Sequence, residues 1–310
     1  MPLRPGSSLP TARRELPAVR LAADHPPHTV ATLVRTGDWR RVARGAYTSV
    51  GPGDDARRAA LARLVGVHHQ LKGPHVFSHG SAALLWGLAL WSLPPDVHVY
   101  QRNRPGPRRD PFIRRHLARL DPTAVTTVAG LPVTTLDRTA LDCARSMRPL
   151  PALVVADAAL RAGAGRDEVL ALIGQDPTGR GMARARLIVT LADAGAESPQ
   201  ESALRFVLLR AGLPAPTTQV RVETRLGPFW ADLGWEDLKI LLEYDGRIKY
   251  DDRDALVREK RRHDALVEAG WRVVRVTKED LRAPDVLVVR VRRSMPGDIP
   301  LVRRPHLNAR

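Results

Sequence analysis

The alternation of apolar and polar positions is clearest in the last third of the chain. A helix is predicted to begin after Ser198, with Pro199 and Glu201 at its first and third positions, and to stop at Gly212. The stretch TTQVRVET and the runs PFWADLGW and LKILLEYDG then predict three strands. A capped helix, the strand WRVVRVT and a helix over PDVLVVRVRRSM complete the pattern. This order predicts a mixed sheet flanked by helices, an α/β or α+β architecture.

The beginning of the chain predicts a smaller unit of another kind. A helix is expected around residues 29–36, ending at Gly37, and WRRVARGAYTSV alternates apolar and basic residues as a hairpin does. A helix followed by a basic hairpin is the outline of a winged helix, although a surface hairpin without a ligand would show the same pattern. The arginines of this hairpin are candidate DNA contacts: Arg40, Arg41 and Arg44.

Between these two units the sequence mixes helices and short strands. Helices are expected over 54–71 and 81–86, DVHVYQR alternates as a strand does, and VAGLPVTTLDRTALDCAR predicts a strand followed by a helix. The loop over 102–111 either contacts phosphates or is a solvated connector. It carries four arginines, namely Arg102, Arg104, Arg108 and Arg109. We therefore expect a winged-helix-like unit over 1–53, a central mixed α/β domain over 54–194, a C-terminal domain over 195–296 and a flexible basic tail over 297–310.

The charge distribution adds a partner class to this picture. The formal net charge is +16, and five of the 49 basic residues are lysines. Such an arginine excess can simply reflect a GC-rich genome. The distribution is more informative, because the chain from Glu197 onward carries a net +4 and the 196 residues before it carry +12. The positive field therefore lies mainly in the first two thirds, where it is suited to hold phosphates.

Composition narrows the class of protein further. A chain of 310 residues with 44% hydrophobic and 26% charged residues is typical of a soluble protein of two or three domains. It contains no apolar run near the roughly 18 residues that cross a bilayer. Its first residues lack the apolar region of a secretory signal. The single Cys143 argues against a disulfide framework and a cysteine-rich zinc site, and favours a reducing cytoplasm.

Two acids stand on the strand predicted by LLEYDGRIKY, where burial should exclude them. Glu243 and Asp245 share one face of this strand, because side chains alternate with period two. If the preceding strand returns through a turn between Asp237 and Leu238, Asp232 lies opposite Glu243, with Cβ atoms about 5 Å apart. Carboxylates so placed repel one another unless a cation neutralises them, and oxygen ligands suit Mg²⁺ or Mn²⁺ better than zinc. A solvated edge strand is the alternative, but apolar residues on both faces favour a buried one.

The same residues resemble a known superfamily. An acid on the entering helix, an aspartate on one strand and a glutamate on the next resemble the PD-(D/E)xK nucleases. ESPQESALRFVLLRAGLPAPTTQ, FWADLGW, LLEYDGRIKY and REKRRHDALVEAGWRVVRVT resemble more closely the actinobacterial branch related to very-short-patch-repair endonucleases. The first two thirds, through WRRVARGAYT and GLPVTTLDRTALDCAR, resemble proteins with an abortive-infection-type antitoxin N-terminus. The resemblance implies a restriction-endonuclease-like fold for the C-terminal domain.

The resemblance also implies roles for individual residues. Asp232 and Glu243 match the metal ligands of the superfamily, and Glu201 matches the helix acid that completes the site. Because Ser198 and Glu201 also have the spacing of a capping box, Glu201 is equally well explained as a cap, and both roles can coexist. Asp245 stands where the superfamily motif has a lysine. Two lysines are candidates to replace it: Lys249, on the same face if the strand continues, and Lys260, on the helix that follows.

Two functions follow as hypotheses. The first is a Mg²⁺- or Mn²⁺-dependent endonuclease that hydrolyses DNA. In it Asp232 and Glu243 hold the metal with Asp245 or Glu201 assisting, the metal activates water, and Lys249 or Lys260 stabilises the charge developing at phosphorus. The second is a DNA-binding regulator or antitoxin-like protein whose nuclease-like domain is inactive. RNA is an open alternative as the substrate, since neither groove readout nor 2′-OH recognition leaves a legible mark in this sequence.

Overall fold

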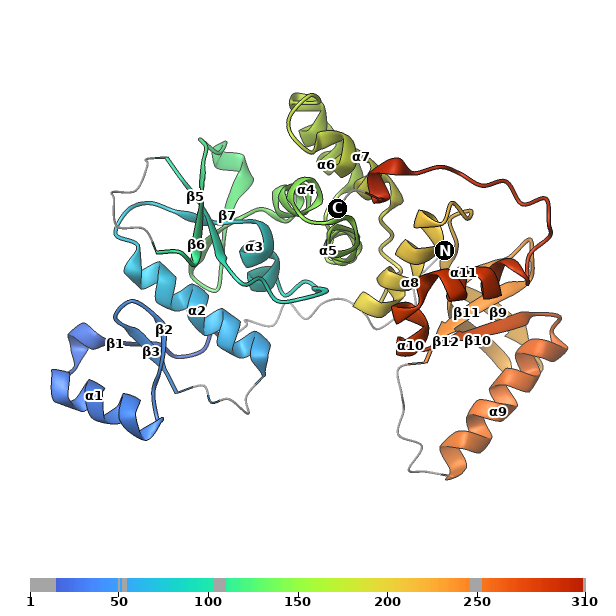
Figure 1. The fold of residues 1–310 in the computed structure, drawn as a ribbon, viewed down its shortest axis with the longest axis horizontal. Helices are drawn as coiled ribbons and strands as arrows, with labels where there is room; N and C mark the ends of the chain where they lie inside the picture. Colours follow the sequence, from blue (N-terminus) through green and yellow to red (C-terminus); the bar gives the residue numbers. More distant parts are fainter. Residues whose placement is uncertain (1–14, 50, 52–54, 103–109, 246–252, 309–310) are drawn as a thin grey trace.

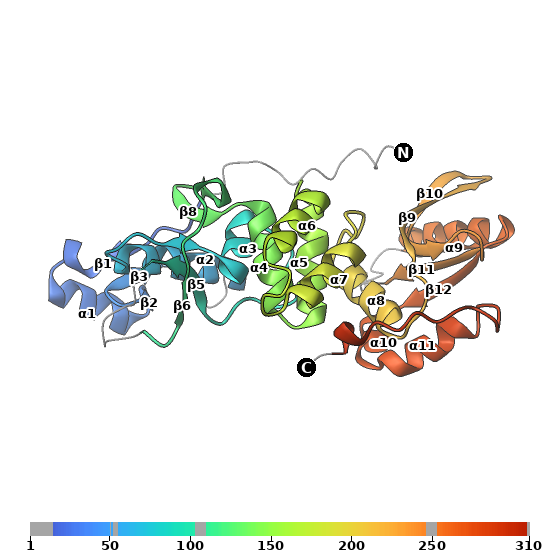
Figure 2. The same ribbon diagram turned by 90° about the horizontal axis from the view of Figure 1, so that it is seen from above.

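The fold is known from a computed structural model, which describes residues 15–49, 51, 55–102, 110–245 and 253–308. This part of the chain contains three sheets and several layers of helices, so the predicted mixed α+β class is confirmed. Figures 1 and 2 show the three sheets spread along an elongated molecule, with a group of helices between the second sheet and the third. No helix in the described ranges is long and apolar enough to span a bilayer.

The N-terminal sheet is small and has the strand order β1-β3-β2. The expected helix and hairpin are both present: the helix ends at Gly37 (φ 84°), and the hairpin turns at Gly45 (φ 71°), two left-handed positions that favour glycine. The elements are β1 (Arg20–Leu21), η1 (Ala22–Asp24), α1 (Pro27–Thr36), β2 (Arg40–Ala43) and β3 (Ala46–Thr48).

Helix α2 (Ala56–Gln70) fixes this hairpin to the rest of the protein. Gly66 lets the two approach closely, because a Cβ atom there would lie 2.9 Å from Val42 Cγ2 and 3.1 Å from Ala43 Cβ. The apolar cluster around Ala43 and Ala46 continues through α2 into the second sheet. The hairpin is therefore held by a core that it shares with the central part of the chain.

The second sheet has five strands in the order β6-β5-β4-β8-β7. The β5/β6 and β4/β8 pairs are parallel, and the β4/β5 and β7/β8 pairs are antiparallel. Helix α3 (His79–Trp86) follows β4 directly and is almost wholly buried. The strands are β4 (Val76–Phe77), β5 (Val97–Gln101), β6 (Ile113–Leu117), β7 (Val125–Val128) and β8 (Leu131–Thr134), and a short η2 (Pro122–Ala124) precedes β7.

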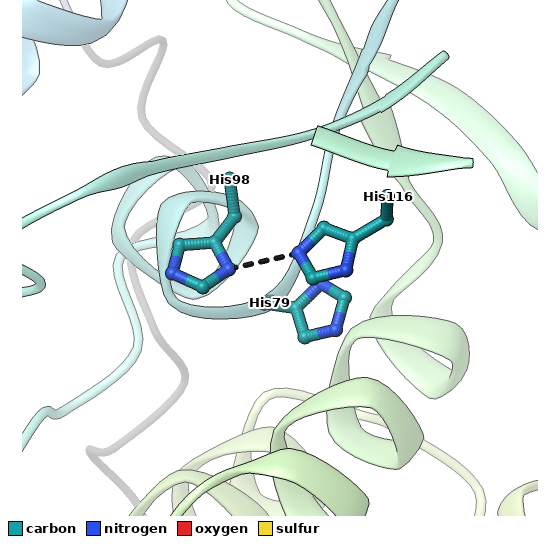
Figure 3. Close-up of side chains that lie close together, drawn as sticks. All are labelled: His79, His98 and His116. Carbon is teal, nitrogen blue, oxygen red and sulfur yellow. Dashed lines mark hydrogen bonds between the residues drawn. The ribbon is translucent and has the colours of Figure 1, made fainter. Parts of the chain in front are cut away.

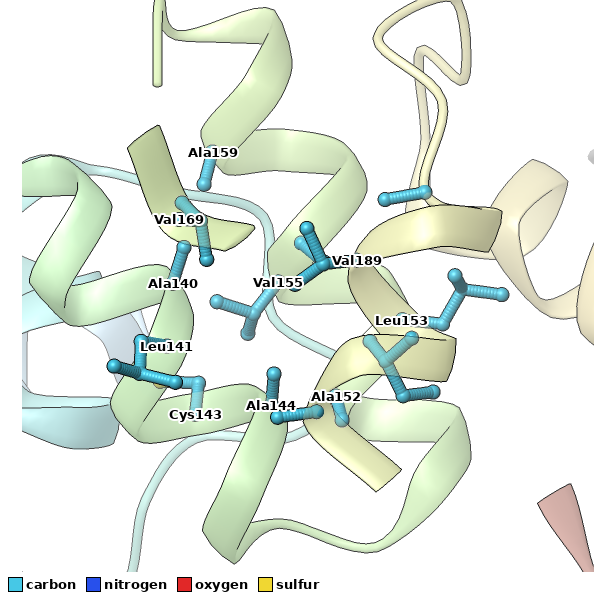
Figure 4. Packing of buried hydrophobic residues seen from close by; sticks show 14 of the residues in the cluster. Ala140, Leu141, Cys143, Ala144, Ala152, Leu153, Val155, Ala159, Val169 and Val189 are labelled. Carbon is cyan, nitrogen blue, oxygen red and sulfur yellow. The ribbon is translucent and has the colours of Figure 1, made fainter. Parts of the chain in front are cut away.

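Four helices form the centre of the molecule around a core of small and branched apolar side chains (Figure 4). Alanines on α4 and α5 let these two helices pack closely, while Val155 and Val189 fill the space between α5 and α7. Phe206 and Leu209 of α8 belong to the same cluster, so this core extends to the C-terminal domain. The helices are α4 (Leu136–Ser146), α5 (Pro149–Arg161), α6 (Arg166–Gln175) and α7 (Met182–Leu191).

The C-terminal sheet has the order β12-β11-β10-β9, with β11/β12 parallel and the other pairs antiparallel. The predicted element order is confirmed, with one short additional helix, α10, that a Thr277–Asp280 capping box starts. The strands are β9 (Thr217–Thr224), β10 (Gly227–Trp235), β11 (Ile240–Tyr244) and β12 (Arg272–Val276). The helices are α8 (Pro199–Arg210), α9 (Arg253–Glu268), α10 (Lys278–Arg282) and α11 (Pro284–Arg292).

The segment expected to be a flexible tail packs against the protein instead. Leu307, in the short η3 (Pro305–Leu307), is 2% exposed and joins the central core. The amide of Val302 donates to Gly212 O at 2.8 Å, and Arg304 Nη1 donates to Leu209 O at 2.9 Å. The sequence did not reveal this contact, because one buried leucine in a polar segment carries no periodic pattern.

Candidate functional site

Asp232 lies where strands β10 and β11 part. The pairs Leu233–Leu242 and Trp235–Ile240 have the register that the sequence predicted, which places position 232 next in line opposite Glu243. The backbone pairing ends at Leu233, and Asp232 Oδ2 instead accepts a hydrogen bond from the amide of Tyr244 at 2.7 Å. The aspartate side chain therefore takes the place of a main-chain acceptor at the open end of the strand pair.

Glu243 is mostly buried and is held by an arginine that the sequence analysis did not single out. Arg262 Nη2 donates to Glu243 Oε1 at 2.7 Å and to Trp230 O at 2.9 Å. The side chain of Glu243 is 14% exposed, so this ion pair is largely sheltered from water. One feature of the sequence, the spacing of Glu259 and Arg262, points to this arginine. Glu259 lies three residues before Arg262 on α9 and so shares its face of the helix. It also reaches the sheet, where it accepts from Arg275 Nη2 at 2.6 Å.

Ser198 caps helix α8, as the sequence predicted, and the Glu201 side chain bonds to residues just before the helix. Its two carboxylate oxygens accept from the amide of Glu197 and from Ser198 Oγ, both at 2.8 Å. Ser198 Oγ in turn accepts from the amide of Glu201 at 3.1 Å. Ser198 is therefore confirmed as the N-cap, but the Glu201 side chain bonds the amide of Glu197 rather than that of Ser198, so the capping box is not reciprocal; the role of Glu201 as a metal ligand stays a prediction.

The three carboxylates share an environment that disfavours their charged forms. Burial raises the pKa of Asp232, while the hydrogen bond from the Tyr244 amide and the charge of Arg262 act to lower it. Burial likewise raises the pKa of Glu243, with Arg262 opposing and the charges of Glu259 and Asp232 adding to the effect. Burial raises the pKa of Glu201 to about 7, with the Glu197 amide opposing and the charge of Asp232 adding. The charge of Asp232 thus contributes to raising the pKa of both Glu201 and Glu243, which is the effect expected of neighbouring like charges.

This donor set fits a hard divalent cation held mainly by two of the carboxylates. Among the described residues, the oxygens of Glu201, Asp232 and Glu243 do not all lie within 4.8 Å of one another, so they do not form one compact set of three ligands. Mg²⁺ usually binds through one or two carboxylates and keeps several waters. Asp232 and Glu243, on adjacent strands, match that requirement.

Of the two candidate lysines, only Lys260 lies among the described residues, and it does not join this cluster. Lys249 lies outside the described residues. Lys260 is exposed on α9. It precedes Arg262 by two residues, about 200° around the helix, so it faces away from Glu243. Asp245 is half-buried, and its amide donates to Val276 O at 2.8 Å. The basic group that the structure brings to the carboxylates is Arg262.

The hairpin arginines lie at an open surface at the other end of the molecule. Arg40, Arg41 and Arg44 are all exposed. Arg41 and Arg44, together with Arg63 of α2, line a cavity of about 560 Å³ that Phe112 borders. Of the loop arginines, Arg102 is exposed, whereas Arg104, Arg108 and Arg109 lie outside the described residues.

A second cluster of ligand-type side chains was missed by the sequence analysis. His79, His98 and His116 come together on the five-stranded sheet (Figure 3). The alternation of DVHVYQR placed His98 on a strand, but which strand lies beside it is decided by the fold. The nitrogen ligands of these histidines suit a different chemistry from that of the carboxylates.

The raised pKa of Glu201 predicts how stability changes with pH in metal-free protein. The pKa of Glu201 is about 7 in the folded protein, against an ordinary value of 4.5. The folded state therefore holds this proton more tightly than the unfolded state does, and this contribution to the free energy of unfolding is fully present below pH 4.5. That contribution is lost as the pH rises through 7, a change on the order of 3 kcal/mol. We expect the free energy of unfolding of Glu201→Gln to approach that of wild type, or to exceed it, as the pH rises from 5 to about 7.5.

Urea unfolding of both proteins in EDTA at several pH values measures the gap between their free energies of unfolding. The comparison of the two proteins isolates Glu201, because all other titrating groups contribute to both. A gap that stays constant over this pH range would contradict the prediction.

Comparison with known proteins places the chain in a family. No family model matches the sequence. An uncharacterized protein of Mycobacterium tuberculosis, MT2308 in strain CDC 1551 / Oshkosh and Rv2248 in strain ATCC 25618 / H37Rv, is 30% identical over 265 residues, covering 84% of this chain and 94% of the relative. The crystal structure of the RV2827C protein from the same species aligns with a TM-score of 0.37 and 17% identity, over 60% of this chain and 75% of that one. The chain belongs to the family of the uncharacterized mycobacterial proteins MT2308 and Rv2248.

Proposed function

We propose that the C-terminal domain is a divalent-metal-dependent endonuclease that hydrolyses DNA phosphodiester bonds. The observation that carries the proposal is the pair of half-buried carboxylates, Asp232 and Glu243, beside Arg262 at the point where the pairing of β10 with β11 ends. Burying like charges is costly unless a cation offsets them. Arg262 offsets part of the charge, and a bound dication would offset the rest.

Within this proposal each side chain has a defined task. Asp232 and Glu243 would hold Mg²⁺ or Mn²⁺, which supplies an activated water and neutralises charge on the phosphate. Arg262 keeps Glu243 in place through a bond anchored at Trp230 O, and it brings a positive charge to the site. That charge would do part of the work of the motif lysine, since Asp245 carries the opposite sign. Glu201 fixes the start of α8 beside Asp232.

The basic N-terminal region would supply affinity for the nucleic acid backbone. Arg41, Arg44 and Arg63 converge on one cavity, and the part of the chain before Glu197 carries most of the net positive charge. Arginines contact phosphates independently of sequence, so this surface would position DNA without selecting a sequence.

The proposal is tested with the full chain, supercoiled plasmid, single-stranded DNA and an RNA of matched length. We expect nicking or linearisation of DNA with Mg²⁺ or Mn²⁺, and none in EDTA or with Ca²⁺ alone. Cleavage of the RNA only would redirect the proposal to a ribonuclease. Binding of all three without any cleavage would reject it.

A second candidate function is favoured by a specific observation. Glu243 is already paired with Arg262, Asp245 replaces the motif lysine and Lys260 faces away from the site. This combination supports a DNA-binding regulator or antitoxin-like protein in which the nuclease-like domain is only a scaffold. Such a protein would bind DNA with the same strength in Mg²⁺ and in EDTA at equal ionic strength, whereas the endonuclease would require the metal for turnover.

Both functions predict the same effect of the hairpin arginines on DNA affinity. Replacing both Arg41 and Arg44 by alanine should weaken DNA binding at about 0.1 M salt. It should also reduce the slope of log K against log salt concentration by about two, one for each lost phosphate contact. Fluorescence anisotropy with a labelled duplex at four salt concentrations measures both quantities. Replacing Arg292 and Arg293, exposed at the end of α11, is the matched control and should change neither. Equal effects of the two double variants would mean that net charge alone, not this surface, sets the affinity.

A further inference from the structure

Three histidine rings meet on one face of the five-stranded sheet (Figure 3). His79 starts α3, His98 lies on β5 and His116 lies on β6. One ring nitrogen of each lies within 4.8 Å of those of the other two. His98 Nδ1 is 3.0 Å from His116 Nε2, and the His79 ring stacks on that of His116 at 3.9 Å between centroids. The separations are close to those of nitrogens that share one metal ion.

The fold places these rings together from segments far apart in sequence. The parallel pair β5/β6 sets Tyr100 beside His116, so His98, two residues before Tyr100, projects from the same face as both. His79 adopts a left-handed backbone conformation (φ 52°), which is uncommon for residues other than glycine although histidine adopts it more readily than most. It is 4% exposed, and its Nδ1 lies 2.9 Å from Ser78 Oγ. The ring of His79 is thus fixed in the cluster by burial and by its contact with Ser78.

Hydrogen bonds from neighbouring side chains surround the three histidines. Ser81 Oγ accepts from the amide of His98 at 2.9 Å. When His79 Nδ1–H donates to Ser78 Oγ, its Nε2 carries a free lone pair, as in metal sites whose outer partners fix the ring tautomer. Oδ1 of the neighbouring Asp142 carboxyl accepts from the Tyr100 hydroxyl at 2.9 Å and from Arg138 Nε at 3.1 Å.

The electrostatic surroundings keep all three rings neutral. Burial and the neighbouring rings lower the pKa of His79 to about 2 and that of His98 to about 4, with Asp96 opposing and Arg114 adding to the effect at His98. Burial, and then Arg145, lower the pKa of His116. Arg145 and Arg138 also act on His79. Neutral imidazole is the form that binds metals.

We propose that His79, His98 and His116 bind one transition-metal dication of the zinc class, with the fourth coordination position taken by water or an anion. Three imidazoles favour Zn²⁺, Co²⁺, Ni²⁺ or Cu²⁺ over Mg²⁺, which prefers oxygen. Three protein ligands with an open fourth position are the arrangement of catalytic zinc sites. The positive charge of Arg145, which lowers the pKa of both His79 and His116, favours an anion such as phosphate at the fourth position. The site lies on a different sheet from Asp232 and Glu243 and does not depend on the nuclease proposal.

The test uses the full chain without a polyhistidine tag, stripped of metal by a chelator and titrated with Co²⁺. We expect one Co²⁺ per chain with visible absorption bands of four-coordinate cobalt, and displacement of the cobalt by one equivalent of Zn²⁺. His98→Gln and His116→Gln should each weaken Co²⁺ binding by about 100-fold or more, since even the loss of an outer partner of a ligand costs 10- to 100-fold. Mg²⁺ in excess should not compete.

Two control variants make the result specific. His68 and His75 form another histidine pair, with His68 Nδ1 3.0 Å from His75 Nε2, and His68→Gln should leave the Co²⁺ spectrum unchanged. Asp232→Asn should also leave it unchanged, which separates this site from the carboxylate site. If the ligand variants do not fold, X-ray absorption at the zinc edge of the unaltered protein counts the imidazoles directly. Fewer than three imidazoles, or no Co²⁺ binding at micromolar concentrations, would overturn the proposal.

Discussion

Asp232→Asn should remove metal-dependent DNA cleavage by at least about 1,000-fold while leaving the fold intact. The asparagine oxygen can still accept from the amide of Tyr244, so the contact where the β10–β11 pairing ends is preserved. Only the negative charge is lost. A metal ion that stabilises charge in the transition state contributes several kcal/mol, and about 1.4 kcal/mol corresponds to each factor of ten in rate.

Stability provides the second readout for this variant. Because burial raises the pKa of Asp232, its charged form is unfavourable in the folded state, and the neutral asparagine should leave the urea midpoint at pH 7.5 unchanged or raise it. Loss of cleavage with unchanged stability is the signature of a ligand rather than of a structural residue. Mn²⁺ should raise the midpoint of wild type but not that of the variant.

Asp237→Asn is the matched control. Asp237 is exposed in the turn between β10 and β11, on the same two-strand unit as Asp232. The Asp237→Asn variant should cleave DNA as fast as the wild-type protein. Unchanged cleavage by Asp232→Asn would reject the endonuclease assignment of this site, and cleavage lost equally in both variants would point to the turn rather than to the metal.

Arg205→Met should destabilise the protein by about 3–5 kcal/mol, the largest stability effect that we expect from a single substitution. Arg205 and Asp157 are 2% and 1% exposed, and Arg205 Nη1 lies 2.9 Å from Asp157 Oδ2. Arg205 Nη2 also donates to Leu191 O at 2.5 Å. Methionine fills much of the space but leaves the buried carboxylate without its cation.

The same contacts explain why this pair matters for the arrangement of the molecule. Asp157 of α5 also accepts from Ser202 Oγ at 2.7 Å and from the amide of Asp193 at 2.8 Å. The pair therefore joins the central helices to α8, the helix that positions Glu201. We expect the loss to appear as a lower urea midpoint and as a weaker coupling between the unfolding of the two parts.

An exposed ion pair serves as the comparison. Arg225 and Glu268 form a bidentate contact at the surface, and Arg225→Ala should leave the urea midpoint nearly unchanged, because solvent screens such pairs. Similar losses from Arg205→Met and Arg225→Ala would show that burial of the pair does not decide its contribution. A double variant, Arg205→Met with Asp157→Leu, should recover part of the stability, since no charge is then left unpaired.

Local sequence determined much of the C-terminal domain. The cap of α8 at Ser198 is a contact between residues three apart, and it appears in the structure with the predicted donor and acceptor. The register of β10 and β11 also followed from the sequence, because a short turn leaves few ways to pair the two apolar runs. The apolar faces of β11 were determined in the same way, with Leu242 on the α8 side and Leu241 on the α9 side.

Tertiary structure alone decided which charged groups meet. Both Lys260 and Arg262 lie on α9, and only the rotation of that helix against the sheet brings Arg262 to Glu243 and turns Lys260 to solvent. His79, His98 and His116 lie on three elements, and their meeting depends on β5 pairing with β6 in parallel and on α3 following β4. Leu307 packs against a core whose other residues lie far before it in the sequence. Periodicity records how each element divides between core and solvent, whereas contacts between distant elements depend on how those elements pack, which no local pattern encodes.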